Sequence, residues 1–465
     1  MKDAFEIKGY WWLPDAPEKK LPGTLSFSQG DGALLVIAGV FGTETDARIE
    51  QPTIILGITQ QGSPISLYKC FYHHWTLPVL GVGGGQYHVH VVFDGVHFES
   101  EANITFHQIC GHYTDLDSWV NIYGFTIERE STKEKFVANI RYEKPSAQFF
   151  DIGDAFEVGI GFSSHGPNHS IVQTEVTISQ QAYLIVKSKA GDTSFETLFS
   201  QLNIFSDLLQ VAAQRVVYPV TVSGLSDKNI QEREGKDSYY PEINIYYQPV
   251  ESLVNQQSTL PQEMLFTYKD LEANQIKTWF GSFEKYQTII HLYRALQYRD
   301  RLFIETKFLN IAQALETLHS TLFGNQYLSD DEFANRKEKV LLSIPEDLHE
   351  WVDTALSNAN FKRFRLKIFE LLDKKSAYFA GLIDDKELFA KRVMVTRNEF
   401  VHQSKHKLAF QRGKELLDAI NLLKMLFEIY LLGIIGFSDE KIQELIEPKK
   451  QSLLTGWKHL RSGVK

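Results

Sequence analysis

The hydrophobic pattern of the chain changes near residue 263, and this change limits the folds that are open to it. Before that point, short alternating or apolar runs such as residues 24–28 and 33–40 recur between Gly, Pro and Asp. This pattern is typical of β-strands separated by turns. After it, apolar residues recur three and four positions apart, as in Ile304, Phe308 and Ile311, which is typical of helices that bury one face. The sequence therefore predicts a β-rich part followed by a helical part.

The β-rich part contains many short candidate strands at close spacing. This favours a sandwich or a barrel-like, partly closed sheet over alternating strands and helices. One helix is expected to fold onto these strands, at residues 194–211. The strands are expected at residues 24–28, 33–40, 53–58, 66–72, 87–93, 103–108, 125–129, 135–140, 156–161 and 170–179.

A polar stretch separates the two parts at residues 223–262, and we expect the junction there, with a last strand at residues 243–247. The expected fold class is α+β multidomain, with a β-rich sandwich or barrel-like domain over residues 1–222. An all-α helical bundle is expected over residues 263–465. Length agrees with this division, because 465 residues exceed what one hydrophobic core usually holds.

The composition is that of an ordinary globular protein, with 43% hydrophobic and 23% charged residues. Two cysteines, Cys70 and Cys110, argue against a disulfide framework and fit a reducing compartment. The first residues show no basic stretch leading into an apolar run, so no signal peptide is expected. No apolar run has the length of a membrane-spanning helix. We therefore expect a soluble, cytoplasmic protein with no membrane partner.

Two features of the β-rich part resemble sites but are incomplete. The glycine-rich run at residues 81–85 is not followed by Lys-Ser or Lys-Thr, so it predicts a flexible hairpin or partner-facing loop rather than a phosphate loop. Seven of the fifteen histidines fall within residues 73–112, and His88 and His90 share one face of a strand. A zinc site needs a third ligand with supporting hydrogen bonds. We expect no cofactor and no catalytic metal in this protein. Metal binding or metal-hydrolase chemistry in the histidine-rich stretch stays open.

The residues most suited to chemistry are Arg397, Asn398 and His402. An arginine keeps its charge at any working pH and binds two phosphate oxygens at once. A histidine has an unperturbed pKa near neutrality, so it can accept or donate a proton in a reaction. An asparagine supplies a neutral donor and acceptor that can orient a ribose hydroxyl or the imidazole. The three residues form a compact set for phosphate chemistry.

A helix arranges this set in a definite way. Asn398 and His402 lie one turn apart on one face, and Arg397 is rotated from His402 by about 140°, so Arg397 and His402 flank one groove. Similar pairs also occur by chance in helical proteins. In that case Arg397 is a solvated helix residue and His402 a hydrogen-bonded core residue, and the pattern alone leaves both interpretations open.

The net charge of −10 is not typical of a nucleic-acid-binding protein. Its distribution is uneven, because residues 361–407 contain twelve basic and six acidic residues. A confined phosphate-binding groove needs such a local surplus, although a solvated helix face has the same composition. The candidate phosphate contacts near the motif are Lys391, Arg392, Lys405 and Lys407.

The helical part resembles the HEPN ribonuclease superfamily, whose all-helical domains carry Arg, usually a polar residue, and His a few positions later. More narrowly, it resembles the Apea-like HEPN proteins. Residues 308–319 (FLNIAQALETLH) are similar to their early helix, and Arg397, Asn398 and His402 to their active site. Residues 9–14 (GYWWLP), with the Pro-Gly-Thr-Leu that follows, resemble the ApeA-type N-terminal β domain that precedes such HEPN domains.

This resemblance implies an endoribonuclease that needs no metal ion. The ribose 2′-hydroxyl attacks the adjacent phosphate and leaves a cyclic phosphate and a free 5′-hydroxyl, with His402 as base or acid and Arg397 stabilising the added charge. The resemblance also implies a homodimer or higher homo-oligomer in which two copies of the motif face one cleft. The expected substrate is tRNA or another structured RNA, cleaved in anti-phage defence by abortive infection. We expect the β domain to restrain the helical domain until it senses a trigger such as a phage protein.

Other residues near the motif carry weaker expectations. Glu316 and His406 are candidate accessory residues. Thr396 and Glu399 have the spacing of a capping box, so a helix that starts at Thr396 would place Arg397 in its first turn. The alternative to a nuclease is a non-catalytic module that keeps the HEPN fold for contact with RNA or protein and recognises a partner through its β domain.

Overall fold

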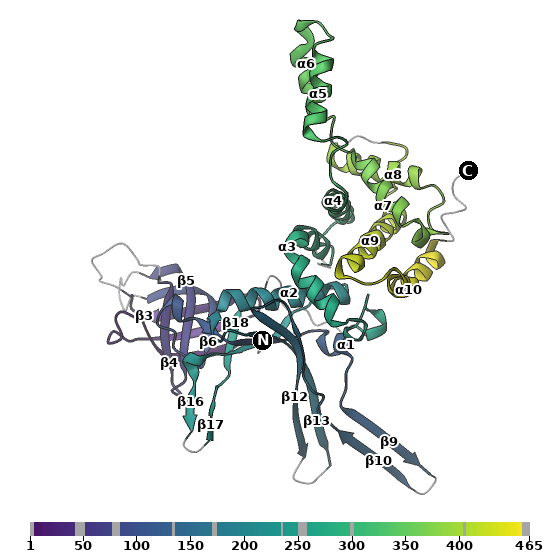
Figure 1. Cartoon of the computed structure of the whole chain (residues 1–465). Coiled ribbons are helices and arrows are strands. Elements are labelled where there is room, and N and C mark those ends of the chain that lie inside the picture. The colour runs from purple at the N-terminus through teal and green to yellow at the C-terminus, as the bar shows by residue number, and fades with distance from the viewer. Residues whose placement is uncertain are drawn as a thin grey trace. The chain divides into compact units, whose positions relative to one another are not determined.

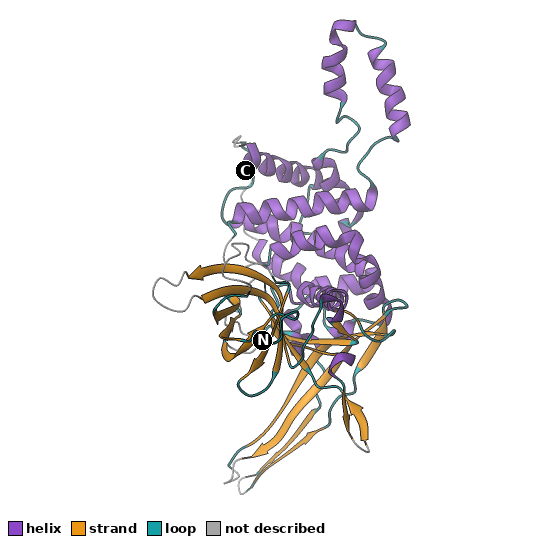
Figure 2. Cartoon of the chain, turned by 90° about the vertical axis from the view of Figure 1, so that its left-hand side faces the viewer, coloured by secondary structure: helices purple, strands orange, loops and turns teal. Residues whose placement is uncertain are grey.

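The computed structural model describes residues 4–41, 52–76, 84–132, 135–169, 174–233, 236–249, 258–297, 302–402 and 406–457. The chain forms two compact units, Met1–Phe280 and Gly281–Lys465. Figure 1 shows the chain coloured by residue number. All strands of the described residues lie in the first unit, and the second unit consists of helices and loops (Figure 2). This confirms the predicted order of a β-rich part followed by a helical part.

Twelve strands of the first unit belong to one sheet, in the order β11-β12-β13-β8-β15-β18-β6-β3-β2-β1-β4-β5. The strands of this sheet are β1 (Phe5–Trp12), β2 (Leu21–Ser28), β3 (Gly32–Ala38), β4 (Ile54–Thr59), β5 (Pro64–Thr76), β6 (Gly84–Asp94), β8 (Gln108–Tyr113), β11 (Gln148–Asp151), β12 (Phe156–His169), β13 (Val176–Ser188), β15 (Pro219–Leu225) and β18 (Ile243–Tyr247).

Six of these strands close on themselves, because β6 pairs with β5 as well as with β3. Side chains alternate across a strand, so Leu35 and Ile37 of β3 point into the closed ring while Val36 lies on the exposed side. The interior also holds the fully buried ring of Trp11. A side chain at Gly57 would bring a Cβ within 2.3 Å of Trp11, so the tryptophan needs glycine at this position.

The other half of the sheet packs against the helix α2 (Phe195–Ala213), which confirms the helix expected there. Ser194 caps its first turn by accepting a hydrogen bond from the Thr197 amide. Strand β18 matches the strand expected at residues 243–247, but it pairs with β15 and β6 inside the sheet. The unit therefore continues through the stretch expected as a junction, 223–262, and ends at Phe280.

Short elements connect the sheet and extend from it. They are η1 (Glu101–Asn103), β7 (Thr105–Phe106), α1 (Leu116–Val120), β9 (Phe125–Ser131), β10 (Phe136–Tyr142), β14 (Thr193–Ser194), η2 (Asp227–Asn229), β16 (Gln231–Arg233), β17 (Lys236–Tyr239), η3 (Pro261–Glu263) and η4 (Tyr268–Asp270). The pairs β9–β10 and β12–β13 form long hairpins that project from the body of the sheet (Figure 1).

The pattern of short runs located most of these strands but not their limits. The strand expected at 103–108 is divided, because only Thr105 and Phe106 form β7 and a bend at His107 separates them from β8. Of the strand expected at 170–179, residues 170–173 lie outside the described residues, and β13 begins at Val176. Strands β1, β8, β11, β14, β15, β16 and β17 were not expected. Residues 81–83 of the glycine-rich run are also outside the described residues, and Gly84 begins β6.

The second unit is a helical bundle, as the spacing of its apolar residues predicts. The long helix α3 (Ala273–Ala295) spans the boundary between the units. The other helices are α4 (Ile304–Phe323), α5 (Asp330–Leu341), η5 (Glu346–Leu348), α6 (His349–Leu356), α7 (Phe364–Lys374), η6 (Ser376–Phe379), α8 (Lys386–His402), α9 (Lys414–Ile435) and α10 (Asp439–Trp457).

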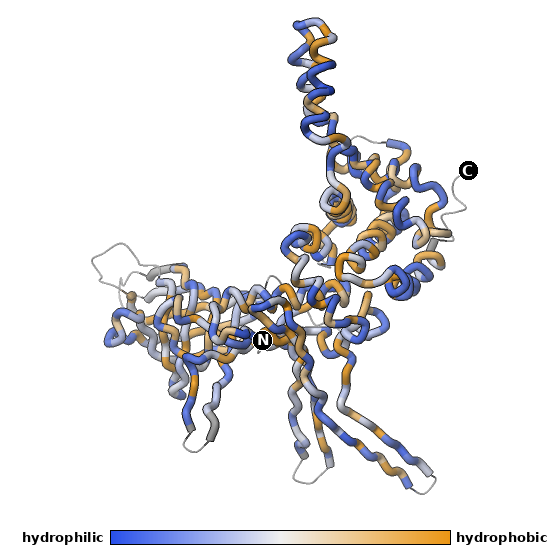
Figure 3. Tube along the Cα trace, viewed as in Figure 1, coloured by the Kyte–Doolittle hydropathy of each residue, from blue (hydrophilic) through white to orange (hydrophobic). Residues whose placement is uncertain are grey.

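Helix α9 is the centre of this bundle and contacts α4 and α10. Its predicted stripe, which includes Leu416, Leu423 and Phe427, is buried, and Figure 3 shows the helix as mostly hydrophobic. By contrast, α5 and α6 contain no buried residue and extend from the bundle as an arm. None of the described helices combines the length and the apolar character needed to cross a membrane.

Candidate active site on helix α8

Arg397, Asn398 and His402 all lie on α8, in its last two turns. The helix begins ten residues before Thr396, so the predicted capping box at Thr396 and Glu399 is wrong. Thr396 is fully buried in mid-helix, where its hydroxyl donates to the Arg392 carbonyl at 2.8 Å and accepts from the Phe410 amide at 2.9 Å. A threonine hydroxyl can form this i−4 bond inside a helix, so Thr396 ties α8 to the segment before α9.

Arg397 is held by two neighbouring helices. Its Nη2 donates to Oε2 of Glu316 on α4 at 3.3 Å, and its guanidinium carbon lies 4.9 Å from the centroid of the Phe364 ring on α7. The side chain stays one-third exposed. A guanidinium has five N–H donors, and Glu316 is its one hydrogen-bond acceptor among the described residues, so donors remain for a ligand. Arg397 is thus positioned by its ion pair with Glu316 and by stacking on Phe364, and some of its N–H donors remain for a ligand.

Glu316 connects Arg397 to a buried lysine. Its other oxygen lies 3.5 Å from Nζ of Lys367, whose side chain is almost entirely buried and also donates to Ser320 at 3.0 Å. A buried ammonium needs such partners, because removal from water is costly for a charge. The predicted accessory residue Glu316 therefore has a structural reason to be present, and it also orients the guanidinium.

A second polar cluster joins α4 to α7 one turn further along. Nε2 of His319, which is fully buried, lies 2.6 Å from Oε2 of Glu370, and Nζ of Lys362 contacts the same oxygen at 3.2 Å. Burial lowers the pKa of His319, and Glu370 opposes this only in part. Desolvation acts to raise the pKa of Glu370, but His319 and Lys362 together bring it below its usual value. The neutral imidazole then donates through Nε2, while its Nδ1 has no partner among the described residues.

Asn398 and His402 are the two residues of the motif whose side chains have no polar partner among the described residues. Neither side chain forms a hydrogen bond or ion pair with any described residue. Asn398 is partly buried and His402 is exposed near the end of α8. The exposure of His402 does not fit the interpretation of a hydrogen-bonded core histidine. It leaves both imidazole nitrogens available to a ligand.

The basic residues around the motif fall into two groups. Some are engaged by neighbouring residues of the bundle. Arg392, for example, donates to the Leu408 carbonyl at 3.1 Å and to Glu415 at 2.6 Å. Others are exposed, as are Lys391 and Lys407. Lys405, a further predicted phosphate contact, lies outside the described residues. The local positive surplus is therefore partly neutralised within the bundle.

The candidate accessory residue His406 lies in the segment after α8. Its Nδ1 accepts from the Leu408 amide at 3.1 Å, and its own amide donates to Glu399 at 3.3 Å. These bonds shape the turn that follows the helix, and the imidazole stays exposed. His406 thus has a structural role in this turn, and its accessory catalytic role stays a prediction.

The motif does not line a cavity that the described residues of the helical unit form elsewhere. That cavity, about 310 Å³, lies between the end of α7 and α10, and its lining includes Lys374, Tyr378, Glu440 and Lys450. Arg397 and His402 are absent from it. On α8 itself, Arg397 and Asn398 are partly exposed and His402 is exposed.

Among the described residues of the histidine-rich stretch, no metal-binding cluster is carried by one strand. His88 and His90 share one face of β6, as expected, and both are exposed. The His88 ring packs edge-on against His73 at 4.3 Å between centroids. Among the described residues, this pair has no third metal-binding side chain. A different member, His107, meets two aspartates distant in sequence, a grouping that spacing along one strand does not predict.

A helical bundle that carries Arg397, Asn398 and His402 in the last two turns of one helix is the arrangement expected of a HEPN protein. The comparisons agree. Residues 309–441 match the family described as Apea-like HEPN, and residues 6–279 match the one described as ApeA N-terminal domain 1. The chain belongs to the ApeA family of HEPN proteins, a family of nuclease type with an anti-phage role. No curated protein and no solved structure matches the chain.

Proposed function

We propose that the protein is an endoribonuclease that cleaves RNA through Arg397, Asn398 and His402 without a metal ion. The observation that carries the proposal is the state of these residues on α8. Arg397 is oriented by Glu316 and Phe364, while Asn398 and His402 have no partner among the described residues and are free to meet a substrate.

In the proposed reaction, the ribose 2′-oxygen forms a bond to the adjacent phosphorus as the bond from phosphorus to the 5′-oxygen breaks. His402 accepts the proton of the 2′-hydroxyl or supplies one to the leaving 5′-oxygen. Arg397 binds the non-bridging oxygens, whose charge grows in the transition state. The products are a 2′,3′-cyclic phosphate and a 5′-hydroxyl, and atoms balance without water or metal.

A single histidine cannot be base and acid at once, so we propose that two protomers supply one histidine each across a two-fold axis. The surface position of the motif supports this, because a second copy of α8 can face it and complete a cleft. The substrate we propose is tRNA or another structured RNA with an exposed single-stranded loop, whose backbone can reach the in-line geometry. In the cell, cleavage would act in abortive infection, with the first unit sensing a phage-derived trigger.

The test is cleavage of labelled total RNA by the full chain in EDTA, with analysis of the RNA ends. His402→Ala should lower the rate by about 10²–10⁴-fold, the usual contribution of a general acid or base. The matched control is His291→Ala, which removes an exposed histidine of α3 in the same helical unit. Cyclic-phosphate ends from wild type and control, but not from His402→Ala, are the expected result.

Intact RNA in all three samples would call for the same assay in cells during phage infection, where a trigger is present. If wild type and His402→Ala protect cells equally and leave RNA equally intact there, the nuclease proposal fails. A binding module that retains the HEPN fold would then account for the protein. Cleavage that EDTA abolishes would also contradict the proposal, because His402 chemistry needs no ion.

A further inference from the structure

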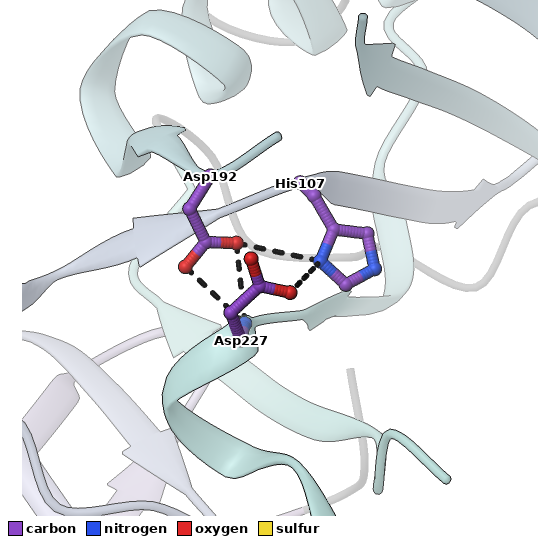
Figure 4. Close-up of side chains that lie close together, drawn as sticks. All are labelled: His107, Asp192 and Asp227. Atoms are coloured by element: carbon purple, nitrogen blue, oxygen red, sulfur yellow. Dashed lines mark hydrogen bonds and ion pairs between the residues drawn. The ribbon is translucent and has the colours of Figure 1, made fainter. Parts of the chain in front are cut away.

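Three residues from separate segments of the first unit converge on one point. His107 lies between β7 and β8, Asp192 precedes β14, and Asp227 begins η2. The pairing of β7 with β14 brings the first two segments together, and the pairing of β15 with β8 places Leu225 opposite Gln108. The sheet therefore brings the three side chains together, although they are far apart in sequence (Figure 4).

We propose that His107, Asp192 and Asp227 bind one divalent transition-metal ion of the Zn²⁺ type. Nδ1 of His107 lies 3.3 Å from Oδ1 of Asp192 and 3.3 Å from Oδ1 of Asp227. One ligand atom from each residue lies within 4.8 Å of the other two. Metal–ligand bonds of about 2.1 Å in a tetrahedral site separate the ligand atoms by about 3.4 Å, so the ion fits with little movement.

Supporting hydrogen bonds orient Asp192. Its Oδ2 accepts from the hydroxyls of Thr105 at 2.8 Å and Ser226 at 3.2 Å, and the amide of Asp227 contacts both of its oxygens. The hydroxyls occupy Oδ2 and leave Oδ1 facing the imidazole. The ring of Tyr240 packs edge-on against His107, with 4.8 Å between centroids. Ligands of protein metal sites are commonly held in this way by neighbours that do not touch the ion.

The charges of the cluster favour a divalent cation. Within the described part of the chain, neither Asp192 nor Asp227 has a lysine or arginine partner. Asp192 is only 15% exposed, so its charge is partly removed from water. A protonated His107 would balance one of the two carboxylates. A divalent ion balances both and leaves the imidazole neutral, which is the state in which its nitrogen binds metal.

The ligand types select among ions. Mg²⁺ and Ca²⁺ prefer sites made of oxygen atoms alone, whereas an imidazole nitrogen with two carboxylates suits Zn²⁺ and its first-row neighbours. Asp227 is 55% exposed, so solvent can supply a fourth ligand. The ion would hold three chain segments together beside the last residue pair of β8 and β15. This site is in the first unit and plays no part in the chemistry proposed for His402.

The test uses the full chain after removal of any affinity tag, stripped with EDTA and then titrated with Zn²⁺ by calorimetry. We expect one Zn²⁺ per chain and a thermal midpoint that rises when the ion binds. Asp227→Asn keeps the shape of an exposed side chain and should weaken binding by at least about tenfold. Its matched control is Asp154→Asn, the same change at an exposed aspartate of the same unit.

A second pair of variants distinguishes loss of the metal site from misfolding. His107→Gln should abolish Zn²⁺ binding, whereas His90→Gln, on the outer face of β6, should bind like wild type. Co²⁺ in place of Zn²⁺ should give the absorption of a tetrahedral site in wild type and lose it in Asp227→Asn. Absence of binding at 100-fold molar excess of Zn²⁺, or equal binding by wild type and Asp227→Asn, would overturn the proposal. The cluster would then be held by the contacts of His107 with Asp192 and Asp227 alone.

Discussion

Arg397 donates a hydrogen bond of 3.3 Å from Nη2 to Oε2 of Glu316, and this contact joins α8 to α4. On its other side, Glu316 is the carboxylate partner of the buried Lys367 on α7. The position of the motif arginine therefore depends on a charge network that the bundle needs for its own stability. This link makes Glu316 a positioning residue for Arg397.

Glu316→Gln should destabilise the protein by about 1–3 kcal/mol, since it leaves the buried Lys367 without its carboxylate partner. The contact with the part-exposed Arg397 contributes only about 0–1 kcal/mol of this. Adding Lys367→Met to the same chain should restore much of the loss, because the unpaired charge is then removed. Urea unfolding of the two variants and of Lys367→Met alone measures the coupling. Strictly additive effects would contradict the network.

Arg397→Lys should lower the cleavage rate about 10–100-fold under the proposed function, although the charge is kept. A lysine cannot bind two phosphate oxygens as a planar fork or stack in the same way on Phe364. Arg336→Lys, at an exposed position of α5, is the matched control and should cleave at the wild-type rate. Since the arginine acts on the transition state, kcat should fall more than KM rises. A change confined to KM would assign Arg397 to substrate binding alone.

A mixed dimer tests whether two chains share one cleft. Co-expression of differently tagged wild-type and His402→Ala chains, followed by two-step purification, gives dimers with one intact histidine. If one histidine is the base and its twin the acid, these dimers should have less than about a tenth of wild-type activity. Half of the wild-type activity would show that each chain carries a complete site. Failure to recover any mixed species would contradict the homodimer itself.

Acid should destabilise the protein through His319. Because burial lowers its pKa in the folded state, the unfolded chain takes up a proton that the folded chain does not as the pH falls below about 6.5. The free energy of unfolding therefore decreases with falling pH in that range. Glu370, whose folded pKa is also lowered, adds a further loss as the pH falls below its usual value of 4.5.

The measurement is the urea midpoint of wild type and His319→Gln at pH 7.5, 6.0 and 5.0. The variant loses the titrating group but keeps a donor for Glu370, so its stability should decline less between pH 7.5 and 5.0. Equal slopes for the two proteins would contradict a neutral His319 in the folded state. Circular dichroism at pH 7.5 confirms that the variant starts from the same fold.

Gly57→Ala should destabilise the first unit by about 1–3 kcal/mol or more, the usual cost of overpacking. The new methyl group would lie 2.3 Å from the ring of Trp11, which fills the closed strands and has no room to move. Gly281→Ala is the control, since nothing lies within 4 Å of the added Cβ and alanine favours a helix by about 0.5–1 kcal/mol. Thermal melts of both variants give the comparison, and an unchanged Gly57→Ala protein would contradict the packing.

The spacing of apolar residues was enough to predict that the first part of the chain is β-rich and the second helical. The three- and four-residue spacing of apolar side chains located α4 and α9, and alternation located β2, β3 and β6. It failed where a strand has little alternation of its own, as with β15, which is fixed by its pairing with β8. It also misread Thr396, because a capping-box spacing inside a helix looks the same as one at its start, and only the start of α8 at Lys386 separates the two.

The sequence by itself determined the order of the two parts. It also determined that Arg397, Asn398 and His402 lie on one helix, because the geometry of residues a few positions apart in a helix needs no tertiary contact. Only the tertiary structure decided that Glu316 and Phe364 hold Arg397, that His402 is exposed, and that His107 meets Asp192 and Asp227. The reason is that strand pairing and helix packing bring together residues far apart in the chain, and these contacts leave no trace in local spacing.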